Sequence, residues 1–385
     1  MHARTTALTA VAALTLSLGP GGTGHSGAAA RTADRPGDLV SSAPTAFRRL
    51  PGQPTPTRAW HIKYRSTTAK GAPNTVSGTV LVPTDGSPGP RPLITYAVGT
   101  VGLADSCAPS AGFPRGTTAE ADLIQLLTLR GWAVAVTDYE GLGTPGVHTY
   151  TVGPAEGRAV LDAARAAERL PGTGLSKDTP VGIMGYSQGG QASGWAAELH
   201  ASYAPELNVK GTAAGGVPAD LLKVAAHNHG STGAGLVLMS AIGQNAAFPE
   251  LRLDAYLNER GRRYVDLMKR SCVAIDTVAG LFREMSDVTV RDPLRRPAWQ
   301  RALHASDLGA RAPDRPVYLY HGTADQLIPY AVGDRLRADW CARRAAVAWR
   351  PIPLGEHVAG AISGSVPAAN WLADRFADRP PHSDC

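Results

Sequence analysis

The sequence predicts an α/β protein with a mostly parallel sheet, helices on both faces, and a helical insertion after the sixth core strand. Two observations lead to this fold class. Short β-type runs alternate with helical patterns over most of the 385 residues, which is typical of parallel strands because each crossover needs a connecting helix. Residues 218–313 then show helical patterns without a clear strand, and this stretch is longer than an ordinary connection between strands.

The expected elements follow one another in chain order. Each expected strand is a short apolar run, and each expected helix is a longer run with helical spacing of its apolar residues. The strand patterns cover residues 59–66, 76–82, 93–98, 133–138, 181–184, 209–214, 317–320 and 346–352. The helical patterns of the core cover residues 118–130, 154–170, 191–200 and 333–344.

The first 30 residues have the plan of a signal peptide. Arg4 precedes a mainly apolar stretch at residues 7–18, and small residues follow it up to Ala28-Ala29-Ala30. Such a short stretch does not span a membrane as a permanent anchor. We expect cleavage after Ala30 and a secreted, extracellular protein without a transmembrane segment.

The rest of the chain divides by composition and pattern. Residues 31–58 are rich in Pro, Gly, Ala and Arg, and we expect a flexible N-terminal arm there. Residues 59–217 and 314–385 are expected to form the core. Residues 218–313 are expected to form a helical cap, or lid, inserted into that core.

One pentapeptide indicates a reactive serine. Gly185-Tyr186-Ser187-Gln188-Gly189 places a serine between two glycines, after a strand pattern and before a helical one. This arrangement predicts a nucleophile elbow, in which a strained turn exposes the serine hydroxyl and the next backbone N–H faces the substrate oxyanion. The alternative is a turn serine in a chain with 43 glycines; the flanking strand and helix patterns favour the elbow.

The partners of such a serine follow it in the α/β-hydrolase fold in the order Ser, Asp, His. Asp325 comes just after the strand pattern 317–320, and His357 lies in the loop after the pattern 346–352. Catalytic groups gather at the carboxyl ends of parallel strands. The sequence therefore predicts a triad of Ser187, Asp325 and His357.

Other polar residues near these positions have simpler interpretations. His321 opens the His-Gly-x-x-Asp turn, and we expect it to brace that turn. Glu356 is expected to be a solvated or supporting carboxylate, because adjacent loop side chains usually diverge. Asp334 and Asp339 fall on the next helical pattern, where a surface role is the default.

Cysteine spacing and charge limit the other function classes. The four cysteines (Cys107, Cys272, Cys341 and Cys385) are even in number and far apart, which suggests two disulfides with three possible pairings. Neither a Cys-x-x-Cys pair nor a His-Glu-x-x-His motif occurs, so we expect no metal and no cofactor. The net charge of +6 is mild, and the arginine clusters at 260–263 and 291–296 are not interleaved with a series of aromatics. Nucleic-acid binding is therefore disfavoured, with attraction to an anionic lipid surface as a weaker alternative to a solvated face.

Three further runs resemble a known family. They are Gly-Thr-Val-Gly-Leu-Ala-Asp-Ser-Cys-Ala-Pro-Ser at 99–110, Asp-Tyr-Glu-Gly at 138–141 and Ser-Tyr-Ala-Pro-Glu-Leu-Asn at 202–208. With the elbow, they are similar to the secretory lipases typified by Candida antarctica lipase A, over residues 60–385. The resemblance implies disulfides between Cys107 and Cys272 and between Cys341 and Cys385.

The resemblance also implies the activity, which is hydrolysis of fatty-acid esters, triacylglycerols included. Ser187 would attack the ester while His357 takes its proton and Asp325 orients the imidazole. The backbone N–H groups of Gln188 and, as the best second candidate, Thr100 would form the oxyanion hole. Gln188 stands where the type member of the family has a glycine, and Thr100 stands where it has an acidic residue.

Two alternatives remain open at the level of sequence. The same triad serves secreted peptidases and acyltransferases, and a hydrolase scaffold can also act as a binding protein without turnover. The apolar cap runs at 236–239 and 273–282 either line an acyl pocket or form the core of the cap itself. The expected partners are a lipid or ester substrate and a transient contact with a lipid interface.

Overall fold

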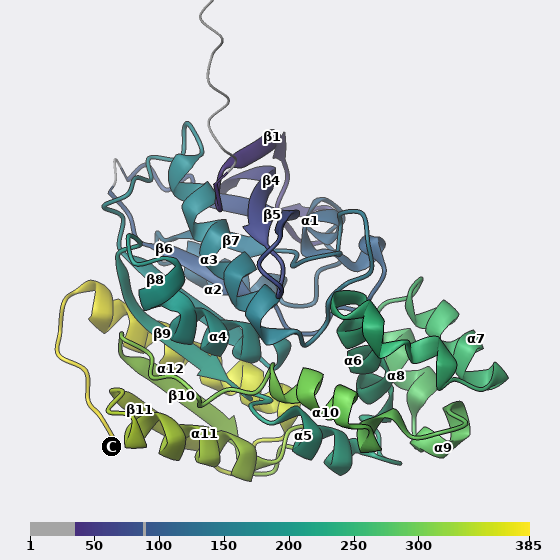
Figure 1. The fold of residues 1–385 in the computed structure, drawn as a ribbon. Coiled ribbons are helices and arrows are strands. Elements are labelled where there is room, and N and C mark those ends of the chain that lie inside the picture. Colours follow the sequence, from purple (N-terminus) through teal and green to yellow (C-terminus); the bar gives the residue numbers. More distant parts are fainter. Residues whose placement is uncertain (1–34, 88–89) are drawn as a thin grey trace, which may run out of the picture. The chain divides into compact units, whose positions relative to one another are not determined.

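The computed structural model describes residues 35–87 and 90–385, and the predicted signal peptide lies outside these ranges. A nine-stranded sheet runs in the order β1-β4-β5-β7-β6-β8-β9-β10-β11 (Figure 1). Its strands are β1 Leu39–Thr45, β4 Thr57–Thr67, β5 Pro73–Pro83, β6 Leu93–Ala97, β7 Ala133–Thr137, β8 Val181–Tyr186, β9 Val209–Gly215, β10 Val317–Gly322 and β11 Val347–Ile352. The strands from β7 to β11 in this order are parallel, whereas β1, β4 and β5 are antiparallel. The predicted mostly parallel α/β sheet is confirmed.

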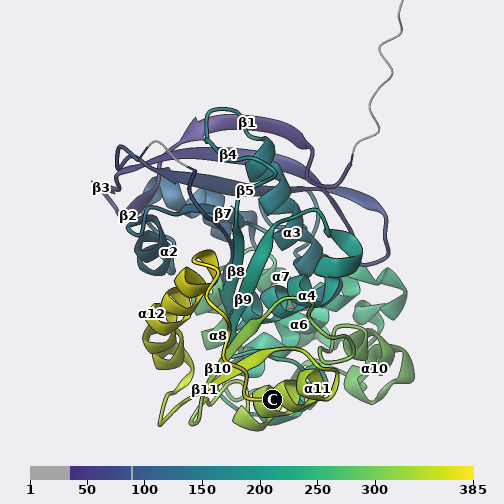
Figure 2. The ribbon, with the colours of Figure 1, turned by 90° about the vertical axis from the view of Figure 1, so that its left-hand side faces the viewer.

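Helices cover both faces of the sheet. Figure 2 shows α2 (Ala121–Thr128) and α12 (His357–Phe376) on one side, with α3 (Gly153–Arg169), α4 (Gln188–Tyr203) and α11 (Tyr330–Ala342) on the other. Every residue of β6 and of β8 is buried, as expected for strands that are covered on both faces. Helices α3 and α4 pack closely because Gly153 has no side chain. A Cβ at that position would lie 1.9 Å from Nε1 of Trp195.

The segment between β9 and β10 is helical. It holds α5 Leu221–Asn228, α6 Ala234–Ala247, α7 Glu259–Met268, α8 Val273–Gly280, α9 Met285–Val288 and α10 Pro297–His304. These helices, green in Figure 1, bury an apolar cluster that includes Met239, Ile242 and Trp299 and is completed by Leu103 and Tyr150 from loops of the core. A disulfide between Cys107 and Cys272 joins the segment to the loop that follows β6.

The N-terminal arm was predicted wrongly for the part that the structure describes. Residues 39–45 form β1, which pairs antiparallel with β4, and β2 (Arg48–Leu50) pairs with β3 (Gln53–Pro54). Phe47 is 2% exposed and packs edge-on against Phe113, with ring centroids 5.1 Å apart. Backbone pairing with β4 and one buried aromatic ring therefore hold a segment whose composition resembles a linker.

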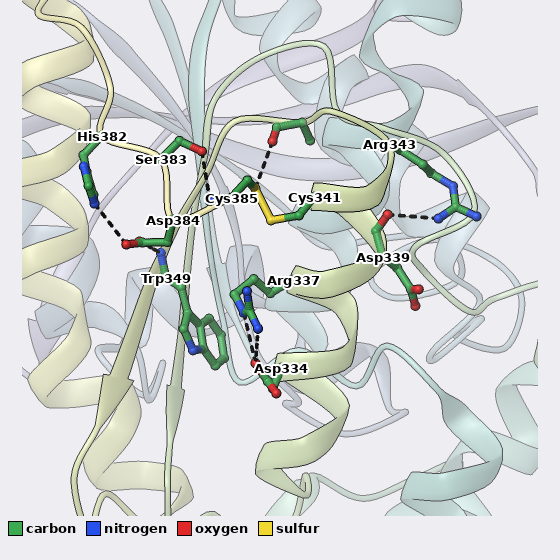
Figure 3. Close-up of a disulfide and its surroundings, with 11 residues drawn as sticks. Asp334, Arg337, Asp339, Cys341, Arg343, Trp349, His382, Ser383, Asp384 and Cys385 are labelled. Atoms are coloured by element: carbon green, nitrogen blue, oxygen red, sulfur yellow. Dashed lines mark hydrogen bonds and ion pairs between the residues drawn. A yellow bond between two sulfur atoms is a disulfide. The ribbon is translucent and has the colours of Figure 1, made fainter.

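The C-terminal end is tied to the core (Figure 3). A disulfide joins Cys341 at the end of α11 to Cys385, and the carboxylate of Asp384 accepts a hydrogen bond from the backbone N–H of Trp349 in β11. Asp334 and Asp339 form ion pairs along α11 with Arg337 and Arg335, at 2.9 Å each. Both aspartates thus take the surface role expected of them.

Candidate active site

Ser187 lies at a sharp turn between β8 and α4. Its backbone has φ 61° and ψ −122°, a conformation that costs free energy for a residue with a side chain. A Cβ on Gly185 would lie 2.3 Å from the carbonyl oxygen of Gly189, and a Cβ on Gly189 would lie 2.0 Å from that of Ala97. Both glycines are therefore needed for the turn, which has the geometry expected of a nucleophile elbow.

A continuous chain of hydrogen bonds joins the three predicted triad residues. Nε2 of His357 lies 2.9 Å from Oγ of Ser187, and Nδ1 of His357 lies 2.8 Å from Oδ2 of Asp325. Because the carboxylate can only accept, Nδ1 carries the proton and Nε2 is free to accept one from the serine. His357 is the first residue of α12 rather than a loop residue, and Glu356 caps that helix by accepting from the N–H groups of Val358 and Ala359.

Asp325 is held rigidly in the loop after β10. Its Oδ1 accepts hydrogen bonds from the backbone N–H groups of Leu327 and Ile328, at 2.9 and 2.8 Å. Burial opposes its ionisation, but the hydrogen bond from His357, the charge attraction to that imidazole and the hydrogen bond from Ile328 together outweigh burial, and the pKa of the carboxyl lies below its usual value. His321 is buried, with Nε2 2.9 Å from the carbonyl oxygen of Ile328, so it braces this turn as expected.

Two backbone N–H groups near Ser187 are candidates for the oxyanion hole. Gln188 begins α4, where the first N–H groups of a helix have no partner within the helix. Thr100 follows β6 and lines the same cavity as Ser187 and His357. The N–H of Gly99 is not available, because it donates to Oε1 of Glu120 at 2.6 Å. Within residues 35–87 and 90–385, the N–H groups of Gln188 and Thr100 have no protein acceptor.

A buried polar group that no sequence pattern indicated lies beneath the elbow. The side-chain Nε2 of Gln188 lies 2.8 Å from Oε1 of Glu156 in α3 and 2.9 Å from Nε2 of His148. Burial raises the pKa of Glu156 to about 8 and lowers that of His148 to about 4. Glu156 lies in the first turn of α3, where the helix dipole stabilises an acidic side chain even when it is exposed. The sequence therefore gave no sign that this carboxyl is buried.

Two cavities meet at Ser187. The inner cavity extends between α5, α6 and α10 and is lined by Gln188, Val224, Ala225, Leu236, Trp299 and Leu303. The outer cavity is lined by Thr100, Leu236, Val273, His357, Val358 and Ile362. Ser187 borders both cavities, whereas His357 borders only the outer one.

The apolar runs of the cap divide between packing and cavity walls. Leu236 and Val237 of α6 line the inner cavity, whereas Leu238 and Met239 belong to the apolar cluster of the cap. Val273 of α8 lines the outer cavity, but Val278 and Phe282 are 68% and 66% exposed. In α6 the two interpretations therefore apply to different residues, whereas Val278 and Phe282 fit neither of them.

Among the described residues, no group of three or more His, Cys, Asp or Glu side chains is placed to hold a metal ion. In the same part of the chain, no helix combines the length and the apolar character that a membrane span requires.

The arrangement of strands, elbow and covering helices defines an α/β-hydrolase fold. Among solved structures, Candida antarctica lipase A in its closed state has this fold with a TM-score of 0.82 and 24% identity, covering 91% of this chain and 84% of that chain. The rice cell wall degrading esterase LipA of Xanthomonas oryzae has a TM-score of 0.70 at 19% identity, over 90% of this chain and 100% of that chain.

Sequence comparison identifies the family. A profile of the family described as "Secretory lipase" matches residues 114–384. A secreted triacylglycerol lipase of Malassezia globosa is 31% identical, over 85% of this chain and 74% of that protein. A probable inactive lipase of Mycobacterium tuberculosis is 30% identical, over 90% of this chain and 79% of that protein. The chain belongs to the secretory lipase family, and it is a lipase or carboxylic ester hydrolase.

Proposed function

We propose that this protein is a secreted serine hydrolase that cleaves fatty-acid esters, triacylglycerols included, through an acyl-enzyme on Ser187. The observation that carries the proposal is the unbroken hydrogen-bond chain from Oγ of Ser187 through His357 to Asp325. Only an activated serine needs this arrangement of a nucleophile, a base and a buried carboxylate.

The proposed reaction has two halves. His357 takes the hydroxyl proton of Ser187 as the serine attacks the ester carbonyl, and Asp325 stabilises the imidazolium that forms. The N–H groups of Gln188 and Thr100 hold the oxyanion, and each such donor is worth about 100- to 1000-fold in turnover. His357 then gives its proton to the departing alcohol, and water repeats the sequence on the acyl-enzyme.

The two cavities suggest how an ester lies in the site. The departing alcohol must receive a proton from His357, so it belongs in the outer cavity, which His357 borders. The acyl chain then extends the other way, into the inner cavity, whose wall includes Leu303 and Trp299. An apolar wall of this kind suits a fatty acyl chain, because its contacts are non-directional and grow with chain length.

The outer cavity also supports transient contact with a lipid surface. Val358 and Ile362 on α12 line it and are 58% and 62% exposed. Val278 and Phe282 are exposed on and just after α8, the helix that supplies Val273 to the same cavity. Exposed apolar side chains beside a site are typical of interaction surfaces. We accordingly propose residues 218–313 as a cap over the serine and residues 1–30 as the signal peptide that directs export.

The probable inactive relative makes loss of turnover the main alternative. A protein that only binds its ligand does not need the strained φ of 61° at Ser187 or the hydrogen bond between Ser187 and His357. Both features therefore favour turnover. A peptidase or acyltransferase would use the same triad on a different acyl donor.

Labelling by a fluorophosphonate tests the proposal directly, because the reagent modifies only an activated serine. We expect one modification, mapped to Ser187 by peptide mass, and none in Ser187→Ala. A folded wild-type protein that resists labelling would instead place the chain with non-catalytic members of its family.

A further inference from the structure

The amide of Gln188 is fixed in one orientation by its neighbours. Nδ1 of His148 lies 3.0 Å from the backbone carbonyl oxygen of Glu140, so Nδ1 carries the proton and Nε2 must accept. The other partner of Gln188 is a carboxyl oxygen of Glu156. Both partners are acceptors, and the two N–H bonds of the Gln188 amide therefore donate to them, one to each.

Glu156 connects this amide to the chain on the other side. Its Oε1 accepts from Gln188 and also from the backbone N–H of Thr151, at 2.9 Å, whereas Oε2 is buried without a partner in the described chain. Glu156 and Gln188 are 0% and 2% exposed. Helix α3, the segment 148–151 and the first residue of α4 are thus joined through one carboxyl group.

The same segment reaches the second candidate donor. The hydroxyl of Tyr150 lies 2.9 Å from Oγ1 of Thr100. The ring of His148 stacks on Tyr139, whose hydroxyl donates to the carbonyl oxygen of Val98, at 2.8 Å. Val98 lies two residues before Thr100. Residues on either side of the serine are therefore held by one buried network.

We propose that Glu156, His148 and the side chain of Gln188 are positioning residues that hold the oxyanion donors of the site in place. The inference rests on the proposed function, because it assigns a purpose to the N–H of Gln188. That N–H belongs to the same residue as the fixed amide, so rotation of the first turn of α4 would move both.

The expected consequence is a loss of turnover rather than of binding. An oxyanion forms only after attack, so a displaced donor weakens the transition state and leaves the substrate complex almost unchanged. Because removal of one donor costs about 100- to 1000-fold, we expect its displacement to lower kcat by about 10- to 100-fold with KM within about 3-fold.

Helix α4 offers a matched control. Oε1 of Glu198 also accepts one backbone N–H, from Gly309, and one side-chain N–H, from Trp340, and its Oε2 is also buried without a partner in the described chain. Glu198 is 4% exposed and borders neither cavity at Ser187. Glu156→Leu and Glu198→Leu therefore remove the same kind of buried carboxyl, near the serine and away from it.

The experiment compares kcat, KM and melting temperature of the wild-type protein, Glu156→Leu, Glu156→Gln and Glu198→Leu on p-nitrophenyl butyrate. We expect both leucine variants to melt earlier, but only Glu156→Leu to lose kcat. Glu156→Gln keeps an acceptor oxygen at the position of Oε1, and we expect its kcat within about 3-fold of wild type.

Three outcomes separate the claims. Equal kcat values for Glu156→Leu and Glu198→Leu would overturn the positioning role, and so would a Glu156→Gln variant as slow as Glu156→Leu. If Glu156→Leu does not fold, Gln188→Met replaces it in the comparison with Glu198→Leu, since both residues lie on α4 and are buried. A folded wild-type protein without esterase activity would contradict the proposed function itself.

Discussion

The two carboxyl oxygens of Asp325 have different partners. The carboxyl of Asp325 uses Oδ1 for the backbone N–H groups of its own loop and Oδ2 for His357. These separate uses allow the orienting role to be removed without disturbing the loop.

Asp325→Asn with its amide nitrogen toward His357 is expected to lower kcat by about 10⁴-fold, because the imidazole must then carry its proton on Nε2 and cannot accept from Ser187. The loop should persist, since the remaining oxygen still accepts from Leu327 and Ile328. Steady-state kinetics and melting temperature measure both effects. Activity within about 10-fold of wild type would show that Asp325 does not orient His357.

The ionisation of Glu156 predicts a pH-dependent stability. Its pKa is about 8 in the folded protein against 4.5 for the free group, so between these values the folded state holds a proton that the unfolded state lacks. Stability from this group is complete below pH 4.5 and is lost as pH rises to 8, by up to about 1.4 kcal/mol per pH unit. His148, with a pKa lowered from 6.5 to about 4, contributes the opposite slope only below pH 6.5.

The wild type should therefore lose about 2 kcal/mol of unfolding free energy relative to Glu156→Gln as the pH rises from 6.5 to 8, because the glutamine does not titrate. Urea denaturation of both proteins at the two pH values measures this change. Parallel curves, with a constant difference at both values, would mean that Glu156 is ionised in the folded protein.

Residue patterns predicted that Ser187, Asp325 and His357 would lie together, as they do in the structure, but not the network beneath them. Ser187 stands in a motif, and Asp325 and His357 follow strand patterns in the order that the fold requires. Glu156 and His148 meet Gln188 only through the packing of α3 and one loop against α4. Contacts of this kind depend on tertiary structure, and no local spacing reports them.

Adjacent residues of helix α5 face different environments. Ala225 is buried and lines the inner cavity, whereas Ala226 is exposed. If the inner cavity holds the acyl chain, Ala225→Leu shortens the space for it, and Ala226→Leu does not.

We expect Ala225→Leu to lower kcat/KM for p-nitrophenyl palmitate by about 10-fold or more while activity on the acetate changes little. Ala226→Leu serves as the control on the same helix. An unchanged ratio of long-chain to short-chain activity in Ala225→Leu would place the acyl chain elsewhere.

The exposed side of α12 gives a prediction about lipid contact. Ile362→Ser should lower the rate on emulsified tributyrin several-fold while the rate on soluble p-nitrophenyl acetate stays near wild type, because only the emulsion presents an apolar surface. Val40 in β1 is also exposed, at 46%, but lies outside the cavity walls, and Val40→Ser is the control. Equal losses on both substrates would indicate a role within the site instead.

Strand β1 was not predicted from the sequence. Five of its seven residues are exposed, so the strand lacks the alternation of apolar and polar residues that predicts a half-buried strand. Its backbone pairs with β4 along one edge of the sheet. Strands β6 and β8, which are buried along their whole length, were predicted because a continuous apolar run is a local property of the sequence.

Across the molecule, the carboxyl ends of four strands bring the candidate site residues to one edge of the sheet. Thr100, Ser187, Asp325 and His357 follow β6, β8, β10 and β11 in turn. The disulfide between Cys107 and Cys272 fastens the helical segment beside that edge, and the pairing is the one that the family resemblance implied. The arrangement of the helices within that segment depends on their mutual packing, and the sequence predicted only that they are helical.

Initial rates on p-nitrophenyl esters from acetate to palmitate, measured for the wild-type protein and for Ser187→Ala, test the central claim most directly. We predict hydrolysis that favours the longer acyl chains and falls by about 10⁴-fold or more in Ser187→Ala. Equal rates for the two proteins, or a folded wild-type protein with no activity on any ester, would contradict the assignment of Ser187 as the nucleophile of a lipase.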